Sequence, residues 1–281
     1  MKKFRKYLIK TDPFDPDVLT NLLWTLEING ITEEENSIIV YLDENSPENS
    51  KTITDLLNSM KENNQINSFF MSEDLIEDKN WNEEFERNTN VVEINERIAI
   101  KPTFKKFNPK QGQLVIQIDP KMSFGTGEHE TTKLVLTLLE KYVPKNGKVL
   151  DVGSGTGVLA IASVLLGADF AFGVDNDEWC LLNGNENVQL NKVEDKVKII
   201  LGTISDIEEN NFDLVIANIN KHILMGLDKD ISLKISETGK LILSGLLNKD
   251  ENDILEIYSN AGFKLIEKLQ MNEWIALVFK K

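Results

Sequence analysis

The sequence contains very little cysteine and histidine. Its 281 residues include one cysteine, Cys180, and two histidines, His129 and His222. A single cysteine cannot form an internal disulfide, and no H-x-x-x-H or C-x-x-C spacing supplies the usual ligands of a metal. Glu128 and Glu130 flank His129, but adjacent side chains seldom point at one ion. We therefore predict no metal site, and we expect His129 to order its loop by hydrogen bonding. The sequence also offers no Ser-His-Asp or Cys-His pairing.

Long hydrophobic runs are also missing. No stretch approaches the length of a membrane span. The basic residues 1–10 are followed by Thr11-Asp12-Pro13, where a signal peptide would have its apolar core. We therefore expect a cytoplasmic protein with no membrane partner.

The chain lacks an excess of positive charge. Its net charge is −15, which disfavours direct binding to nucleic acid. Residues 1–85 carry 8 Lys and Arg against 18 Asp and Glu, a difference of −10 that leaves −5 for the rest. An acidic front end suits a basic partner, although solubility alone would also account for it.

Residues 1–72 alternate between strand and helix patterns. The strand patterns fall at residues 6–10, 31–34, 37–42 and 66–71. Apolar residues recur at helical spacing over residues 18–26 and 53–60. The resulting βαββαβ order predicts a small ferredoxin-like domain. Residues 73–90 follow as a predicted interdomain linker helix that contains Trp81 and Phe85.

Residues 91–281 predict a second, larger domain. Three short strands come first, and strands and helices alternate from Lys148 onward. The later strand patterns fall at residues 148–152, 170–175, 197–201, 212–217 and 240–245. This alternation predicts a doubly wound parallel sheet. Residues 263–270 and 274–279, joined by a short turn, predict an antiparallel hairpin at its edge. The sequence thus indicates an α/β fold with a Rossmann-like sheet of seven strands.

A glycine-rich turn follows the strand at residues 148–152. It reads Gly153-Ser154-Gly155-Thr156-Gly157 and precedes a predicted helix, whose first N–H groups suit an anionic group. Asp175, at the end of the next strand, suits a ribose diol. A dinucleotide fingerprint would need glycine where Val158 stands, and no P-loop lysine follows. We predict a nucleoside-cofactor site. Asp151 either holds this turn by hydrogen bonds or contacts the cofactor.

Two further stretches are expected to complete the site. Asn218 follows the strand at residues 212–217, at the edge where open α/β sheets bind ligands, and its carbonyl oxygen can accept an N–H from an amine. An ordinary turn asparagine is the alternative. Residues 119–132 form a polar loop with glycines and hydroxyls, which favours binding. The position of the glycine turn between a strand and a helix, Asp175 and the edge hairpin together favour the class I methyltransferase fold.

Several stretches resemble the ribosomal protein L11 methyltransferase family (PrmA type). They are residues 122–132, 150–157, 217–219 and 243–246, with Glu273-Trp274. The chain departs from the family at Glu128-His129-Glu130, where many members read Thr-His-Pro.

The resemblance implies a protein methyltransferase that uses S-adenosylmethionine. It implies transfer to lysine ε-amino groups, and to the N-terminal α-amino group, of a basic large-subunit ribosomal protein, L11. Residues 1–72 would recognise this substrate. Asn218 and Trp274 are the predicted catalytic residues, with Trp274 near the methyl acceptor. The predicted cofactor contacts are Thr126, Thr132, Gly153, Ser154, Gly155, Asp175 and Asn218.

Three alternatives stay open from the sequence. The first is a related methyltransferase that acts on another protein, a small molecule or RNA, although the acidity of the chain weighs against RNA. The second is a nicotinamide-dependent oxidoreductase, which Val158 weakens. The third is a non-catalytic binding module that has kept the fold.

Overall fold

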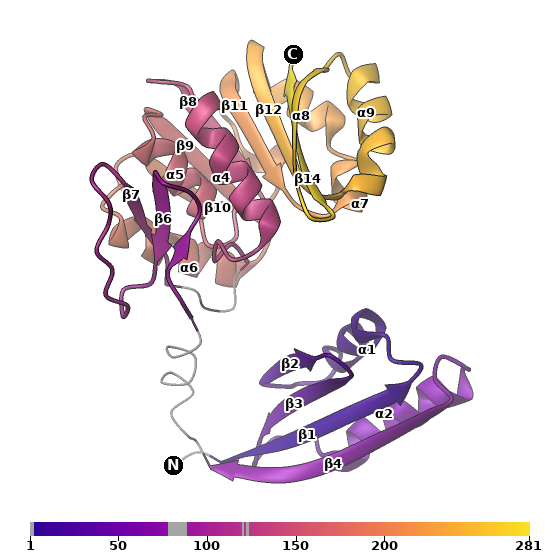
Figure 1. Cartoon of the computed structure of the whole chain (residues 1–281). Coiled ribbons are helices and arrows are strands. Elements are labelled where there is room, and N and C mark those ends of the chain that lie inside the picture. Colours follow the sequence, from indigo (N-terminus) through magenta and orange to yellow (C-terminus); the bar gives the residue numbers. More distant parts are fainter. Residues whose placement is uncertain (1–2, 78–88, 120, 122–123) are drawn as a thin grey trace. The chain divides into compact units, whose positions relative to one another are not determined.

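The computed structural model describes residues 3–77, 89–119, 121 and 124–281. The chain divides into two compact units, Met1–Asn88 and Thr89–Lys281, and both are drawn in Figure 1. Among the residues that the structure describes, no helix has the length and apolar character needed to cross a membrane.

The first unit has the predicted ferredoxin-like topology. Its elements in chain order are β1 (Lys3–Asp12), α1 (Pro16–Leu23), β2 (Gly30–Glu34), β3 (Ser37–Asp43), α2 (Ser50–Glu62) and β4 (Ser68–Glu77). The strands form one antiparallel sheet in the order β2-β3-β1-β4. Leu19 of α1 and Ile53 of α2 join one apolar core with Tyr7 and Val40 of the sheet, so both helices cover the same face. The prediction for residues 1–72 is confirmed at the level of fold.

The predicted linker helix is wrong for residues 73–77, which belong to β4. The reason is the length of β1, whose ten residues pair with all ten residues of β4, so that Lys3, Phe4 and Arg5 lie opposite Glu77, Ile76 and Leu75. Lys6 lies opposite Asp74 in this register, and opposite charges across an antiparallel pair favour the extended conformation. Residues 78–88, with Trp81 and Phe85, lie outside the described residues, so the rest of the helix stays a prediction.

The second unit begins with a small three-stranded sheet in the order β5-β6-β7. Its strands are β5 (Val92–Glu93), β6 (Ile98–Lys101) and β7 (Leu114–Gln117). Helix α4 (Glu130–Tyr142) follows and leads into the main sheet.

The main sheet has seven strands in the order β10-β9-β8-β11-β12-β14-β13. Its elements in chain order are β8 (Lys148–Val152), α5 (Val158–Leu165), β9 (Phe170–Asp175), α6 (Glu178–Leu190), β10 (Val197–Leu201), β11 (Phe212–Asn218), α7 (Lys221–Leu224), α8 (Asp228–Lys234), β12 (Ile235–Leu247), α9 (Glu251–Asn260), β13 (Lys264–Met271) and β14 (Trp274–Lys280). Strands β8 to β12 run parallel, and β14 is antiparallel to both of its neighbours. The predicted parallel sheet and edge hairpin are therefore confirmed.

Two apolar cores lie on the two faces of this sheet. The α4 and α5 side chains pack on one face, and the α8 and α9 side chains pack on the other, as Figure 1 also shows for these helices. The strand order reverses between β8 and β11, because β9 lies on one side of β8 and β11 on the other. Ligands of open α/β sheets bind at the carboxyl ends of the strands beside such a switch point.

Candidate active site

The glycine turn lies at this switch point, directly after β8. Gly153, Gly155 and Gly157 have φ angles of +75°, +52° and +79°, a region that side chains other than glycine rarely adopt. A Cβ on Gly155 would overlap the carbonyl oxygen of Phe124. Glycine is therefore needed here both for the backbone conformation and for the loop that crosses above it.

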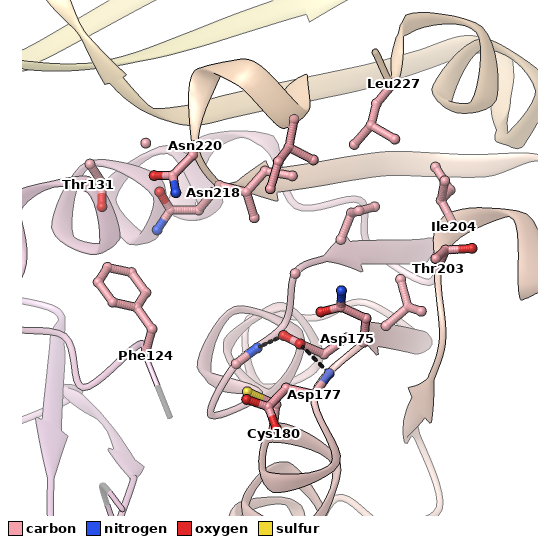
Figure 2. Close-up of a pocket in the computed structure, with 18 of the residues that line it drawn as sticks. Phe124, Thr131, Asp175, Asp177, Cys180, Thr203, Ile204, Asn218, Asn220 and Leu227 are labelled. Carbon is pink, nitrogen blue, oxygen red and sulfur yellow. Dashed lines mark hydrogen bonds between the residues drawn. The ribbon is translucent and has the colours of Figure 1, made fainter. Parts of the chain in front are cut away.

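Asp175 connects the glycine turn to the start of α6. Its Oδ2 accepts a hydrogen bond from the Gly155 N–H at 2.9 Å, and its Oδ1 accepts one from the Asp177 N–H at 3.1 Å. Figure 2 shows both bonds on one carboxylate. Asp177 in turn caps α6 by accepting from the Trp179 N–H. Asp175, the acid predicted at the end of β9, is thus held in place by the glycine turn.

A cavity of about 670 Å³ opens beside these groups. This volume is in the range of small-molecule sites. Five of the predicted site residues line it, namely Gly153, Gly155, Asp175, Asn218 and Trp274. The other three do not: Thr132 and Ser154 are buried behind the wall, and Thr126 is half-buried in the loop.

Asn218 ends β11 and brings a polar side chain to the cavity. The residue is 8% exposed, and its Nδ2 donates a long hydrogen bond of 3.5 Å to Thr132 Oγ1. Its Oδ1 has no hydrogen-bond partner among the described residues. In Figure 2 this side chain lies on the side of the cavity toward Thr131 and Phe124. A buried acceptor without a partner is costly, and an N–H group entering the cavity would satisfy it.

Three rings form a wall of the same cavity. His129 packs edge-to-face on Trp274 with the ring centroids 4.7 Å apart, and Phe124 packs on His129 at 5.6 Å. His129 also caps α4, because its Nδ1 accepts from the Thr131 N–H at 3.2 Å and lies 2.8 Å from Thr131 Oγ1. The predicted role of His129 in ordering its loop is confirmed, and Trp274 is fixed by the ring that the loop supplies.

Asp151 lies beneath the glycine turn and is fully buried. Neither carboxyl oxygen makes a hydrogen bond to a described residue, so Asp151 does not hold the turn in that way. Burial raises the pKa of its carboxyl from 3.8 to about 7; the nearby Ala160 amide opposes this rise without reaching hydrogen-bond geometry, and the Asp175 charge adds to it. The group is poised between its neutral and charged forms near neutral pH.

The sequence did not single out several other residues of the wall. They follow the carboxyl ends of β9, β10 and β11, and they are Asn176, Asp177, Cys180, Gly202, Thr203, Ile204, Asn220, Ile223 and Leu227. The strand-end rule that identified Asn218 would also have identified Thr203, which comes two residues after β10. Among the described residues, no group of three or more His, Cys, Asp or Glu side chains is placed to hold a metal ion.

The fold and this cavity define a class of protein. Five parallel strands with an antiparallel β14 inserted beside β12, a glycine turn after β8 and an acid at the end of β9 are the arrangement of the class I methyltransferases. A family model described as "Ribosomal protein L11 methyltransferase (PrmA)" matches residues 19–281. The chain belongs to this family.

Individual relatives agree with the family model. The chain is similar to the ribosomal protein L11 methyltransferase of Acetivibrio thermocellus, with 34% identity over 205 residues, 73% of this chain and 65% of that protein. It is 37% identical over 207 residues to the enzyme of Clostridium botulinum strain Eklund 17B, 74% of this chain and 66% of that protein. The matched region therefore spans slightly less than two thirds of these relatives.

A solved structure shows the same fold. The crystal structure of ribosomal protein L11 methylase from Lactobacillus delbrueckii subsp. bulgaricus superposes with a TM-score of 0.64 at 30% identity. The superposition covers 67% of this chain and 97% of that one.

Proposed function

We propose that the chain transfers methyl groups from S-adenosylmethionine to amines of ribosomal protein L11. The observation that carries the proposal is Asn218, which lines the same cavity as the glycine turn and Asp175 and whose buried Oδ1 has no partner among the described residues. One cavity thus combines a nucleoside site with a side chain that can orient an amine. The names of the relatives supply the acceptor protein.

The residues present fit the methyl donor. S-Adenosylmethionine has a ribose diol and two positive charges, on its sulfonium and ammonium groups. Asp175 offers carboxylate oxygens to the diol, and the turn at Gly153 and Gly155 offers a close backbone approach to the methionine part. Asp151, unpaired behind the turn, favours a cation in front of it. Thr132 supports the site through Asn218, and we keep Thr126 and Ser154 as predicted contacts.

The chain itself orients and desolvates the reacting amine. When bound, the donor supplies an activated methyl group together with its own leaving group. Asn218 Oδ1 accepts an N–H of the amine, which fixes the direction of the nitrogen lone pair. Phe124 and Trp274 narrow the cavity and exclude water. The apolar rings beside the amine disfavour its ammonium form, so they lower the pKa of an entering lysine and favour the neutral form that can react. We assign no general base.

The acceptor fits the charge of the chain. We propose lysine ε-amino groups and the N-terminal α-amino group of L11 as targets, with the unit Met1–Asn88 recognising the protein. The excess of acid in residues 1–85 complements a basic ribosomal protein. We expect no direct contact with nucleic acid or a membrane, and we place the reaction in the cytoplasm. Another protein, a small molecule or RNA is the alternative acceptor.

A thermal-shift titration tests the donor. S-Adenosylmethionine at a hundred times its Kd should stabilise the folded chain by about 2.7 kcal/mol, whereas NADH should give no shift. Asp175→Asn, which keeps the size of the side chain, should weaken the shift. Stabilisation by NADH alone would contradict the assignment of the site.

A further inference from the structure

Helix α6 has three asparagines on one face, and they are hydrogen-bonded rather than exposed. Asn183, Asn187 and Asn191, the last being the residue that caps the helix, are spaced by four and so lie above one another. Asn187 is fully buried and Asn183 is 2% exposed. Buried amides are costly when a polar atom lacks a partner, and among the described residues only Asn183 Oδ1 of these three side chains is buried without one.

The partners of this asparagine ladder (Asn183, Asn187 and Asn191) are backbone groups of residues 117–119. Asn191 both accepts from the Gln117 N–H at 2.9 Å and donates to the Gln117 carbonyl at 2.6 Å. Asn187 Oδ1 accepts from the Asp119 N–H at 3.0 Å, and Asn183 Nδ2 donates to the Asp119 carbonyl at 3.1 Å. The ladder therefore pairs with the end of β7 and with Asp119 after it, as a neighbouring strand would.

Asn187 differs from the other two because it also bonds to the glycine turn. Its Nδ2 donates to the Thr156 carbonyl at 3.0 Å. Thr156, which is fully buried, meets the loop above the turn in two places, since its N–H donates to the Phe124 carbonyl at 2.9 Å and its Oγ1 donates to the Gly125 carbonyl at 2.8 Å. The Asn187 carboxamide thus connects Asp119 to the glycine turn, which Phe124 and Gly125 contact through Thr156.

The two bonds of Asn187 require a side chain that is a donor at one atom and an acceptor at the other. Asp119 presents an N–H and Thr156 presents a carbonyl, so the orientation of the amide is fixed by its surroundings. Aspartate at this position could still accept from the Asp119 N–H. Its other oxygen would face the Thr156 carbonyl oxygen, and the two would repel each other. Serine is too short to make both.

We propose that Asn187 is a positioning residue for the donor site. By bonding Asp119 and Thr156 together, it holds the loop that carries Phe124 and His129 in register with the glycine turn. Only one readout of this proposal, the affinity for the donor, rests on the proposed function. Asn187 acts through the turn and the loop, since it does not line the cavity.

The test compares Asn187→Asp and Asn187→Ser with Asn191→Asp, a control that removes an amide donor from the same ladder without touching the turn. Binding of S-adenosylhomocysteine by calorimetry is measured beside the melting temperature of the unliganded protein. Both Asn187 variants should raise the Kd at least about tenfold, whereas Asn191→Asp should leave it within about twofold at a similar loss of melting temperature. Asn187→Ser introduces no buried charge and keeps the test open if Asn187→Asp does not fold.

Hydrogen exchange adds a readout that does not need the ligand. In Asn187→Ser, peptides that contain Gly125 and Thr156 should exchange faster than in the wild type, and in Asn191→Asp they should not. Unchanged Kd and exchange in Asn187→Ser would overturn the proposal, as would an equal loss of affinity in Asn191→Asp. A wild-type chain that fails to bind S-adenosylhomocysteine would instead contradict the proposed function, and the exchange result would still decide the role of Asn187.

Discussion

Asn218 is the single residue on which the proposed chemistry depends most, because it lines the cavity and its buried Oδ1 has no partner among the described residues. Asn218→Ala removes the acceptor that orients the amine and leaves Asp175 and the glycine turn in place. We expect kcat to fall by roughly a hundredfold, since loss of orientation has a cost of this order, and the donor Kd to change far less. Steady-state kinetics and donor titration on the same preparation measure the two effects.

Asn220→Ala is the matched control for this variant. Asn220 also lines the cavity, but it follows the end of β11 and makes no side-chain capping bond at the start of α7. Its loss should have a smaller effect on kcat. Wild-type turnover in Asn218→Ala would remove Asn218 from the reaction.

Asp151 should make the stability of the second unit depend on pH. Its pKa is about 7 in the folded chain and about 4 when unfolded, so between these values the folded state holds a proton that the unfolded state has lost. The stabilisation that this bound proton contributes is therefore complete below about pH 4 and decreases as the pH rises to about 7. Above about pH 7 the effect of Asp151 on stability no longer changes with pH. Asp151→Asn removes the titration. The free energy of unfolding of this variant minus that of the wild type should therefore increase by on the order of 2 kcal/mol from about pH 5.5 to about pH 8.

Urea unfolding of both proteins at the two pH values measures this difference. Other titrating groups are common to both proteins and cancel in the comparison. A difference between variant and wild type that does not change with pH would show that Asp151 is already charged in the folded state.

Sequence alone was most informative about residues at strand ends. Gly153, Asp175 and Asn218 could be assigned to one site because the carboxyl ends of parallel strands meet at one edge of the sheet. The protonation of Asp151 could not be predicted, because it depends on burial by elements distant in the sequence. The bonds of Asn187 were equally out of reach, since they join segments 68 and 31 residues away.

At the scale of elements, the glycine turn should tolerate no side chain at its centre. Gly155→Ala places a Cβ against the Phe124 carbonyl at a φ of +52°, so it combines backbone strain with a clash against backbone. We expect a loss of about 2–4 kcal/mol in stability and a marked loss of donor binding. Urea unfolding and donor titration measure the two quantities.

Gly262→Ala is a control that introduces backbone strain without a clash. Gly262 has a φ of +91°, but a Cβ there would meet nothing within 4 Å. Strain alone should cost about 1 kcal/mol, and donor binding should be unaffected. Equal effects of the two substitutions would mean that the contact of the turn with the loop is unimportant.

Local patterns predicted most elements, and the main error came from a non-local cause. Period and end signals are contained within a segment, so β8 and β9 were placed to within a residue. Residues 73–77 were predicted to begin the linker helix. The length of β1, which is over 60 residues distant in sequence, decides that they pair as a strand instead.

At the scale of the whole molecule, the two units should have separable tasks. Each has its own apolar core, and every described residue that lines the cavity belongs to Thr89–Lys281. The isolated second unit should therefore fold and bind the donor with an affinity within about threefold of the full chain. Methylation of L11 should fall sharply, because the unit Met1–Asn88 is the proposed recognition domain. Circular dichroism, donor titration and kcat/KM for L11 check these three points.

Full activity of the isolated second unit would contradict separate tasks for the two units. A second unit that methylates L11 as well as the full chain does would leave the first unit without its proposed role. The strand and helix patterns indicated two domains, and the acidic front end suited a basic partner, but neither contains information that selects L11 among basic proteins. That assignment comes from the relatives.

Mass spectrometry of the acceptor is the direct test of methyl transfer to amines of L11. Unmethylated L11 is incubated with the full chain and S-adenosylmethionine, and with Asn218→Ala as the matched control. We expect mass gains of whole methyl groups on lysine side chains and on the N-terminal amine, and much smaller gains with the variant. L11 that stays unmodified with a chain shown to bind the donor, while another acceptor in a ribosomal protein mixture gains methyl groups, would contradict it.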